Sequence, residues 1–415
     1  MNFAESLAYL YSLGSEAQAM QTLALKVELE STHALCAALG NPERQLRAVH
    51  IAGTNGKGST SAMTEAIAMA AGLRVGLYTS PHLVEITERF RVNGTDISPD
   101  DFARLATVVR AAADGLVARG QLIAPPSYFE QVTAIGFLYF VEKKVDLAVL
   151  EVGLGGRLDA TNVCHPLVCA ITPVSRDHQQ YLGHTLAAIA GEKAGIIKTS
   201  APVVVAPQDP EAWPVIEARC AAFGAPLIDA ASQLSRSEVE ALPARSVAEA
   251  GLYHFRCRTH VREYDIRLNL RGRYQITNAC TAILIVEQLQ QAGMAIAARD
   301  IVNGLARVNW PGRLELLYPA PDAPPHLLDG AHNPAGAQVL REFLDEHCPH
   351  PLTMIFGVMS DKTLAEIADI LFPAANTVIA TQVNNPRAAT PDQIVGLTQG
   401  RDWSVETAAN AGQAL

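Results

Sequence analysis

The sequence predicts an α/β fold, in which a doubly wound, mostly parallel sheet of the P-loop type is followed by a smaller, Rossmann-like α/β domain. Three observations support this prediction. Strand-like and helix-like segments alternate over most of the chain, the strand-like runs are nearly all apolar, and a glycine-rich loop joins the first strand to a helix. Parallel strands that helices cover on both faces have this apolar character. The 415 residues are enough for two or three domains.

The first strand is predicted over residues 47–52, and the helix after the glycine-rich loop over 59–71. Gly72 is expected to end this helix, because glycine readily adopts the left-handed conformation that closes helices. The alternation of apolar runs and amphipathic segments then predicts the next elements in order. These are a strand over 74–79, helices over 99–119 and 129–143, and strands over 145–151 and 167–172.

The pattern changes from about residue 205 to residue 274. Residues 255–261 and 264–270 are alternating runs on either side of a short turn, which predicts an antiparallel hairpin at the edge of the first domain. A helix over 278–292 is predicted to follow.

The segment Trp310-Pro311-Gly312 marks the predicted domain boundary, because proline and glycine interrupt both helices and strands. It separates a first domain over residues 1–309 from a second over 310–415. In the second domain we predict strands over 326–328, 353–356 and 377–380, and a final helix over 404–415.

The composition argues against several classes of protein. Asp and Glu number 42 and Lys and Arg 32, so the net charge of −10 offers no basic footprint for nucleic acid. No apolar run approaches the roughly 18 residues of a membrane span, and the N-terminal stretch lacks the regions of an export signal. The seven cysteines are scattered without a CxxC pair, as in proteins with reduced thiols. We therefore expect a cytoplasmic protein with neither a nucleic-acid nor a membrane partner. We also expect a monomer.

The strongest local motif is the glycine-rich loop Gly53-Thr54-Asn55-Gly56-Lys57-Gly58-Ser59-Thr60 between the first strand and its helix. Backbone N–H groups at a helix N-terminus bind phosphate, and a lysine adds a positive charge. The loop departs from the G-x-x-x-x-G-K-[ST] pattern, because Ile51 replaces its first glycine and Gly58 separates Lys57 from Ser59. The alternative is a glycine-rich turn without a ligand.

Three polar residues lie at or just beyond the carboxyl ends of predicted strands: Ser80, Glu151 and His178. In a parallel sheet these ends share one edge, where ligands bind. A carboxylate there is suited to holding the magnesium of a nucleotide. Each residue also has a structural alternative: Ser80 as a turn residue, Glu151 as a solvated loop acid, and His178 as a polar group that starts a helix.

Three further residues are candidates for the site. Lys193 follows a predicted helix that starts near residue 184, and its alternative is a solvated lysine. In the second domain, Asp329 leads into a tight loop where it can bind ribose or metal-bound water, or form an Asx turn before Asn333. Arg313 can reach phosphate oxygens as a bidentate donor.

Seven segments together resemble the folylpolyglutamate synthases of the Mur-ligase family, in the order found there. They are residues 53–60, 79–83, 151–162, 177–178, 191–195, 311–313 and 329–334. The two longest, GTNGKGST and EVGLGGRLDATN, are highly specific together, and the resemblance covers nearly the whole chain. Within that family the chain is most similar to the bacterial enzymes that are also dihydrofolate synthases.

The resemblance implies an ATP-dependent ligase that adds L-glutamate to dihydropteroate or to a reduced folate. In this family ATP phosphorylates the acceptor carboxylate, and the amine of glutamate attacks the acyl phosphate. Magnesium and Lys57 would offset the repulsion between carboxylate and phosphate. The first domain would bind ATP and the pterin, and the second would be the glutamate-ligase domain.

The resemblance also implies roles for individual residues. The catalytic residues would be Lys57, Glu151, His178 and Lys193. The ATP-binding residues would be Thr54, Asn55, Gly56, Lys57, Gly58, Ser59, Asn278, Arg313 and Asp329, and the magnesium ligands Ser80, Glu151 and His178. Lys193 matches a lysine that is carbamylated in the family, which replaces a cation by a carboxylate.

The pterin is expected to bind where a predicted helix begins, at Ser127, Tyr128, Phe129 and Glu130. Aromatic rings provide stacking area for a flat heterocycle, and a carboxylate accepts its N–H donors. Leu158, Asp159 and Ala160 would form the facing wall. The alternative is that Tyr128 and Phe129 are core residues of an amphipathic helix.

Three other functions compete with this interpretation. The nearest is a folylpolyglutamate synthase without dihydrofolate synthase activity. A Mur enzyme that acts on a UDP-sugar peptide would need a separate N-terminal domain, but only 46 residues precede the first predicted strand. A non-catalytic ATP-binding protein would need neither an Arg and Asp of the second domain facing the nucleotide nor a carboxylate-binding cleft.

Overall fold

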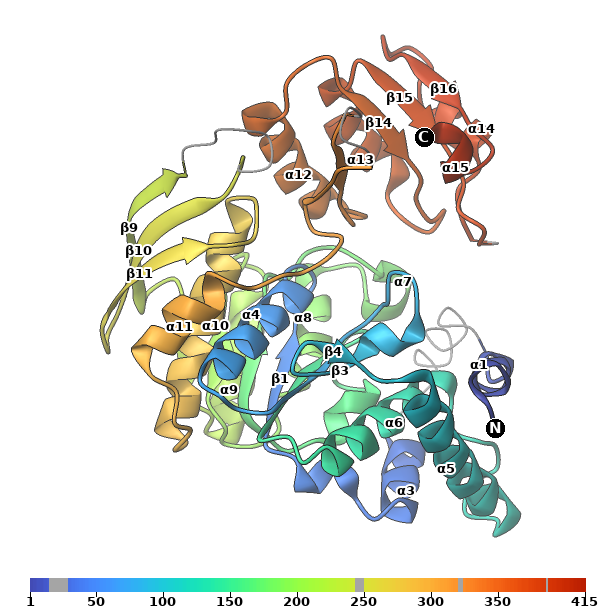
Figure 1. Ribbon diagram of the computed structural model, residues 1–415, viewed down its shortest axis with the longest axis vertical. Helices are drawn as coiled ribbons and strands as arrows, with labels where there is room; N and C mark the ends of the chain where they lie inside the picture. The colour runs from blue at the N-terminus through green and yellow to red at the C-terminus, as the bar shows by residue number, and fades with distance from the viewer. Residues whose placement is uncertain (15–28, 243–249, 320–323, 386) are drawn as a thin grey trace.

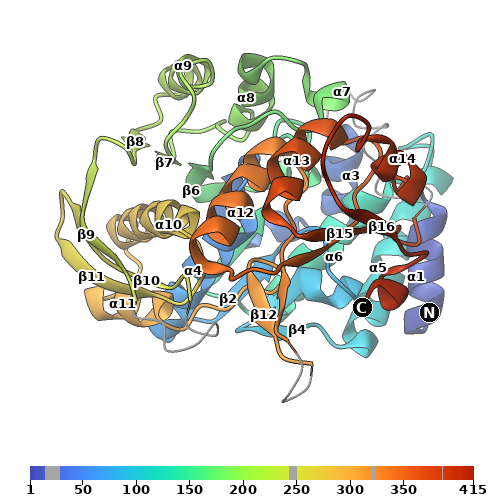
Figure 2. The ribbon, with the colours of Figure 1, turned by 90° about the horizontal axis from the view of Figure 1, so that it is seen from above.

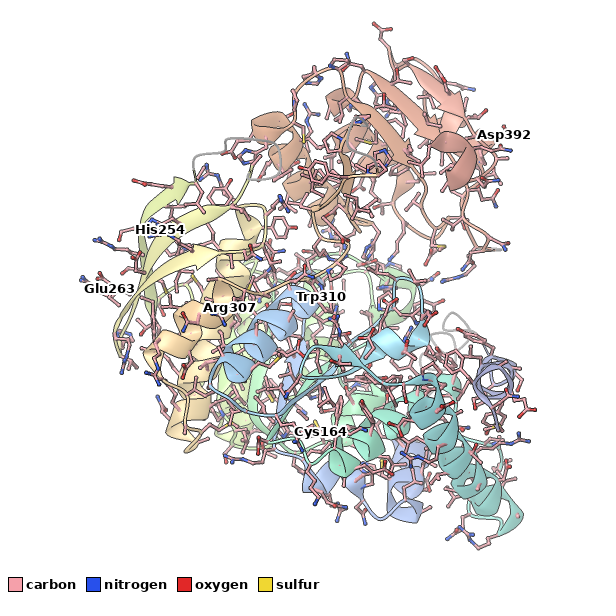
Figure 3. The ribbon with its side chains drawn as sticks, viewed as in Figure 1. Cys164, His254, Glu263, Arg307, Trp310 and Asp392 are labelled. Atoms are coloured by element: carbon pink, nitrogen blue, oxygen red, sulfur yellow. The ribbon has the colours of Figure 1, made fainter. Side chains whose placement is uncertain are left out.

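The computed structural model describes residues 1–14, 29–242, 250–319, 324–385 and 387–415. A larger body contains the elements up to α11, and a smaller one, built from the elements after residue 310, lies across one end of it (Figure 1). Trp310 lies at the junction between the two bodies (Figure 3). Its ring packs against α4, where a Cβ on Gly58 would lie 2.9 Å from the indole.

The larger body is built on an eight-stranded sheet with the order β4-β3-β2-β5-β1-β6-β7-β8. Its strands are β1 Ala48–Ala52, β2 Val75–Tyr78, β3 Phe90–Val92, β4 Thr95–Asp96, β5 Leu147–Glu151, β6 Pro166–Ile171, β7 Val203–Val205 and β8 Leu227–Asp229. Strands β2, β5, β1, β6, β7 and β8 pair in parallel, and only the β2-β3-β4 edge is antiparallel. The predicted doubly wound, mostly parallel sheet is therefore confirmed.

Helices cover both faces of this sheet, which explains why its strands are apolar at successive positions. Val49 and Ile51 of β1 belong to a core with α4 Lys57–Ala70, α10 Tyr274–Gln291 and α11 Ala298–Leu305. The alternate residue Ala48 belongs to a core on the other face. Helices α1 Phe3–Ser12, α3 Glu30–Ala38, α5 Pro99–Ala118 and α6 Tyr128–Glu142 form that core, and α8 Leu186–Ala194 and α9 Trp213–Phe223 pack beside β6 and β7.

A separate antiparallel sheet lies against α10 and α11, with the order β11-β10-β9 (Figure 1). Its strands are β9 Leu234–Ala241, β10 Tyr253–Thr259 and β11 Glu263–Leu268. The predicted hairpin is present as β10 and β11. The sequence did not predict β9, nor that β7 and β8 continue the parallel sheet beyond residue 203.

The smaller body contains two sheets rather than one series of strands (Figure 2). The pair β12 Glu315–Leu317 and β13 His326–Leu328 is antiparallel, whereas β14 Thr353–Phe356, β15 Thr377–Ala380 and β16 Val405–Thr407 are parallel. The helices are α12 Pro334–His347, α13 Leu364–Leu371, α14 Pro391–Gly396 and α15 Ala411–Ala414. The helix predicted over 404–415 is wrong in its first half, because Val405–Thr407 pairs with β15.

Short helices connect the main elements at several points along the chain. They are η1 Pro42–Gln45, η2 Ile86–Arg89, η3 Ala160–Val163, α7 Gln179–Leu182 and η5 Phe372–Ala374. Among the described residues, no helix combines the length and the apolar character needed to span a membrane. The seven cysteines are free thiols, and six of them are buried, such as Cys164 in the core that contains Ala48 (Figure 3).

The buried residue His50 of β1 makes the stability of the fold depend on pH. His50 is fully buried and lies 2.8 Å from Thr161 Oγ1, and burial lowers its pKa to about 3. The unfolded chain takes up this proton near pH 6.5 and the folded chain does not, so acid destabilises the fold between these values. We expect the unfolding free energy to fall by about 2 kcal/mol more in the wild type than in His50→Gln between pH 7 and pH 5. Chemical denaturation at both pH values measures this difference, and equal losses would contradict it.

Candidate active site

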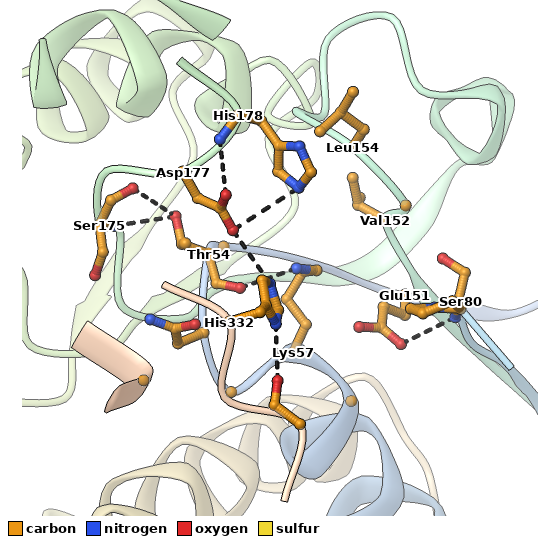
Figure 4. Close-up of a pocket in the computed structure, with 18 of the residues that line it drawn as sticks. Thr54, Lys57, Ser80, Glu151, Val152, Leu154, Ser175, Asp177, His178 and His332 are labelled. Carbon is orange, nitrogen blue, oxygen red and sulfur yellow. Dashed lines mark hydrogen bonds and ion pairs between the residues drawn. The ribbon is translucent and has the colours of Figure 1, made fainter. Parts of the chain in front are cut away.

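A cavity of about 650 Å³ lies where the carboxyl edge of the large sheet meets the smaller body. It is lined by residues of both, including the glycine-rich loop, the ends of β2 and β5, the segment after β6, and the start of α12 (Figure 4). Every predicted site residue except Tyr128 lines this one cavity. This arrangement agrees with the expectation that the carboxyl ends of parallel strands meet at one edge of the sheet.

The glycine-rich loop presents the N-terminus of α4 to the cavity. Gly56 precedes the helix with φ 87°, and among the described residues no side chain caps the first N–H groups of α4. A Cβ at Gly56 would lie 2.4 Å from Asn278 Oδ1, so both the backbone conformation and the close approach require glycine. Uncapped N–H groups at a helix N-terminus fit a phosphate.

Lys57 is half-buried beside this N-terminus, and its Nζ donates to Thr54 O at 3.1 Å. Burial lowers the pKa of Lys57, whereas the nearby carboxylates of Glu151 and Asp177 favour its charged form. An ammonium has three donors, so a phosphate oxygen is a suitable further acceptor.

Glu151 is buried at the end of β5 rather than solvated in a loop, with 5% of its surface exposed. Its Oε2 accepts a hydrogen bond from Ser80 N at 3.3 Å. Burial raises the pKa of Glu151, and the charge of Lys57 opposes this effect. A buried carboxylate with so few partners fits a divalent cation, which prefers oxygen ligands.

His178 adopts φ 50° before α7, and its buried Nδ1 has no hydrogen-bond partner among the described residues. Burial lowers its pKa to about 4, which favours the neutral imidazole that metals bind. His178 lies apart from the Ser80–Glu151 pair, across the cavity beside Asp177 (Figure 4). The described residues include no cluster of three or more His, Cys, Asp and Glu that could hold a metal ion.

Lys193 is buried, with 4% of its surface exposed, and its Nζ donates to Gly53 O at 2.7 Å. It is therefore not a solvated helix lysine. Burial lowers the pKa of Lys193 to about 7, and the nearby charge of Lys57 lowers it further. A substantial fraction of this amine is neutral near physiological pH.

Two predicted residues of the smaller body face the first domain's loop. Arg313 Nη1 donates to Gly312 O, so the rest of its guanidinium is available to the cavity. Asp329 accepts from Leu314 N through Oδ2 and from Ala331 N through Oδ1. The second contact is the Asx turn considered as the alternative for Asp329, although the residue also lines the cavity.

Of the four residues predicted to bind the pterin at the start of α6, three line the cavity and Tyr128 does not. Phe129 lines the cavity, but Tyr128 is fully buried and stacks on Tyr11 with ring centroids 5.8 Å apart. Tyr128 is therefore a core residue, because neighbouring side chains of a helix point in different directions. Glu130 lines the cavity while its carboxylate accepts from Ser31, Thr32, and the N and Oγ of Ser127.

Leu158, Asp159 and Ala160 line the cavity as expected. Asp159 is buried, and burial raises its pKa against several opposing hydrogen bonds. Its Oδ2 accepts from Gly153 N and Leu154 N at 3.0 Å each. Asp159 thus also fixes the loop that follows Glu151.

Several residues of the cavity were not predicted as site residues. Asp177, His332 and Lys362 form ion pairs, and Asn333 exchanges two hydrogen bonds with Asn55. Asp177, His332 and Asn333 could have been predicted as site residues, because they lie in the segments 177–178 and 329–334 that carry the resemblance. Lys362 lies in no such segment, and nothing in its local sequence indicated the site.

Comparison with known proteins identifies the family. The model of the Mur ligase middle domain matches residues 51–286, and that of the Mur ligase glutamate ligase domain matches residues 312–415. The chain belongs to the Mur ligase family. The predicted fold class and the predicted enzyme class, an ATP-dependent ligase that uses magnesium, are therefore confirmed.

The curated relatives include enzymes named for both activities and enzymes named for one of them. The dihydrofolate synthase/folylpolyglutamate synthase of Bacillus subtilis is 37% identical over 89% of this chain and 85% of its own length. The folylpolyglutamate synthase of Lacticaseibacillus casei is 36% identical over 99% of this chain and 93% of its own. Folylpolyglutamate or dihydrofolate synthesis is thus the activity that the relatives support.

Solved Mur ligase structures agree with the fold over nearly the whole chain. Mycobacterium tuberculosis folylpolyglutamate synthase complexed with ADP and AMPPCP has a TM-score of 0.85 and 33% identity, covering 95% of this chain and 88% of that one. A structure described as an FPGS-AMPPCP-folate complex has a TM-score of 0.83 and 32% identity, covering 100% and 98%.

Proposed function

We propose that this ligase is bifunctional, adding L-glutamate to 7,8-dihydropteroate and to tetrahydrofolates. The observation that carries the proposal is the single cavity in which a phosphate-binding helix N-terminus, a buried carboxylate and cations of the second domain come together. A ligation with three substrates needs them oriented in one cleft between the domains. The relatives named for both activities, from Bacillus subtilis and Mycobacterium tuberculosis, support the bifunctional assignment.

The first half-reaction joins two anions, the acceptor carboxylate and the γ-phosphate of ATP. The carboxylate oxygen attacks phosphorus and ADP leaves. Lys57 and the N–H groups of Gly58 and Ser59 would bind the phosphate oxygens and offset the repulsion. Ser80, Glu151 and His178 would hold magnesium, which supplies further charge neutralisation when bound.

The second half-reaction joins glutamate to the acyl phosphate. The neutral amine nitrogen attacks the acyl carbon and the acyl C–O bond to phosphate breaks. The amide forms as inorganic phosphate leaves and the nitrogen releases a proton. Phe129 and Leu158 would bind the pterin, which places the acceptor carboxylate beside the phosphate loop. The alternative is a folylpolyglutamate synthase without the dihydropteroate reaction.

Two product assays test the proposal. Purified protein is incubated with ATP, magnesium and glutamate, and either dihydropteroate or tetrahydrofolate. We expect dihydrofolate from the first acceptor and a glutamylated folate from the second, each with stoichiometric ADP. Product from tetrahydrofolate alone would identify the monofunctional alternative. Absence of both products would contradict the ligase assignment itself.

We further propose that Lys193 is carbamylated in the active enzyme. Carbamylation requires a neutral amine, and the pKa of Lys193 of about 7 provides one at neutral pH. With ¹³C-bicarbonate we expect a carbamate carbon resonance in the wild type that is absent in Lys193→Met. The exposed Lys144 provides the control, because its replacement by methionine should leave the resonance unchanged. A wild type without this resonance would contradict the proposal.

A further inference from the structure

The two bodies meet inside the cavity at one carboxylate, Asp177. Lys362 Nζ lies 2.5 Å from its Oδ1, and His332 Nε2 lies 3.2 Å from its Oδ2. Asn333 Nδ2 also donates to Oδ2, at 3.2 Å. These three partners belong to the smaller body, whereas Asp177 follows β6 of the large sheet. Asp177 is therefore a point at which the second domain docks on the first.

The ion pair is shielded from water. The side chains of Asp177 and Lys362 are only 7% and 9% exposed. A carboxylate with these partners in so enclosed a place fixes the positions of Lys362 and His332.

His332 is oriented from both sides of its ring. Nδ1 lies 2.8 Å from Gly330 O, and Nε2 faces Asp177. Both ring nitrogens face oxygen atoms, so the position of the ring is fixed from two sides. The second domain thus contributes the Lys362 ammonium and the His332 imidazole to the lining of the cavity.

Asn333 connects the same contact to the glycine-rich loop. Its amide exchanges hydrogen bonds of 3.2 and 3.0 Å with Asn55, and its Oδ1 caps α12 by accepting from Gly336 N. The N-terminus of α12 therefore lies against the loop that leads to Lys57. The side chains of Asn333 and Asn55 therefore link the position of the second domain to the phosphate site.

We infer that Asp177 is a positioning residue for ligation, which sets Lys362 and His332 of the second domain against the bond-forming part of the cavity. This inference rests on the proposed ligase function. Both half-reactions develop negative charge between the two domains, where oriented charged and polar side chains stabilise it. Asp177 acts through Lys362 and His332 and does not itself contact the reacting atoms.

A second contact between the two bodies provides the matched control. Arg273, at the start of α10, lies 2.9 Å from Glu346 of α12, and both side chains are partly exposed. Neither residue lines the active-site cavity. Loss of this pair weakens domain contact without changing the cavity, whereas loss of the Asp177 charge affects both.

The experiment compares Asp177→Asn with Glu346→Gln. Asparagine keeps the size of the side chain, and its amide oxygen can still accept the hydrogen bond from the backbone N–H of His178. We expect kcat of Asp177→Asn to fall on the order of 100-fold, as when one preorganised electrostatic contact is lost. AMPPCP affinity and the magnesium concentration for half-maximal activity should stay within about threefold, less than 1 kcal/mol. Glu346→Gln should keep wild-type kcat.

The variant Lys362→Met removes the partner of Asp177 on the second domain and so tests the same ion pair. Because Asp177 acts through Lys362 and His332, the loss in the double variant should be smaller than the product of the two single losses. Unchanged kcat in Asp177→Asn, an equal loss in Glu346→Gln, or multiplying losses would overturn the positioning role. A large shift in magnesium dependence alone would do so as well. A wild type that forms no product would contradict the proposed function instead.

Discussion

Lys57→Ala is expected to reduce the rate of ADP formation by about 1,000-fold while the protein stays folded. The ammonium lies at the uncapped N-terminus of α4, and it is the cation of the glycine-rich loop that faces the phosphate site. Without it, two anionic reactants must approach each other with less charge compensation. Coupled detection of ADP at saturating substrates measures the rate, and thermal unfolding checks the fold.

Lys143 is the matched control for this substitution. Its Nζ lies 3.1 Å from Asp101 in a partly exposed ion pair on the surface. Exposed pairs contribute at most about 1 kcal/mol to stability, so Lys143→Ala should retain wild-type turnover. If Lys57→Ala also formed ADP at a rate near that of the wild type, its assignment to the phosphate site would be wrong.

Glu151→Gln is the second variant with a large expected effect. The substitution preserves the shape of the side chain and removes the negative charge at the end of β5. We expect turnover to fall by about 1,000-fold and the magnesium requirement to rise, because a neutral amide is a poor ligand for a hard dication. Initial rates over a magnesium titration separate the two effects.

Glu65→Gln controls for the loss of a buried carboxylate as such. Glu65 lies on α4, is 6% exposed, and accepts from Gly94 N, and neither residue lines the cavity. Burial raises its pKa to about 7, so a neutral amide replaces a group that is already partly protonated at neutral pH. Its turnover should match the wild type. Equal activity of Glu151→Gln and Glu65→Gln would exclude a specific role for Glu151.

The parallel sheet was predictable because its strands are buried on both faces and are therefore apolar throughout. Strand β9 was missed for the opposite reason. Its sequence, LSRSEVEA, is dominated by polar residues, and its pairing with β10 is set by a partner rather than by its own composition. The short strand β16 was likewise predicted as helix, because three residues carry too little periodicity to separate the two structures.

Local sequence was also sufficient to predict that the residues at strand ends and in the glycine-rich loop lie together. It was insufficient at Tyr128, where the aromatic character suited both a pterin and the core, and only the direction of the side chain separates these alternatives. The contacts of Asp177 with Lys362 and His332 join positions more than 150 residues apart. Such contacts depend on how two domains dock, which periodicity and motif spacing do not describe.

The hydrogen bonds around the glycine-rich loop have a consequence for how the protein acquires activity. Thr54 bonds to Ser175, 121 residues away, Ser59 to Gln275, 216 away, and Asn55 to Asn333, 278 away. During synthesis the loop emerges early, but two of these three partners, Gln275 and Asn333, follow only after most of the chain has been made. Closing such long loops costs entropy before any contact is gained. Chains interrupted before residue 275 would therefore contain the nucleotide motif without its full support, so binding competence arises late, as a property of the finished chain.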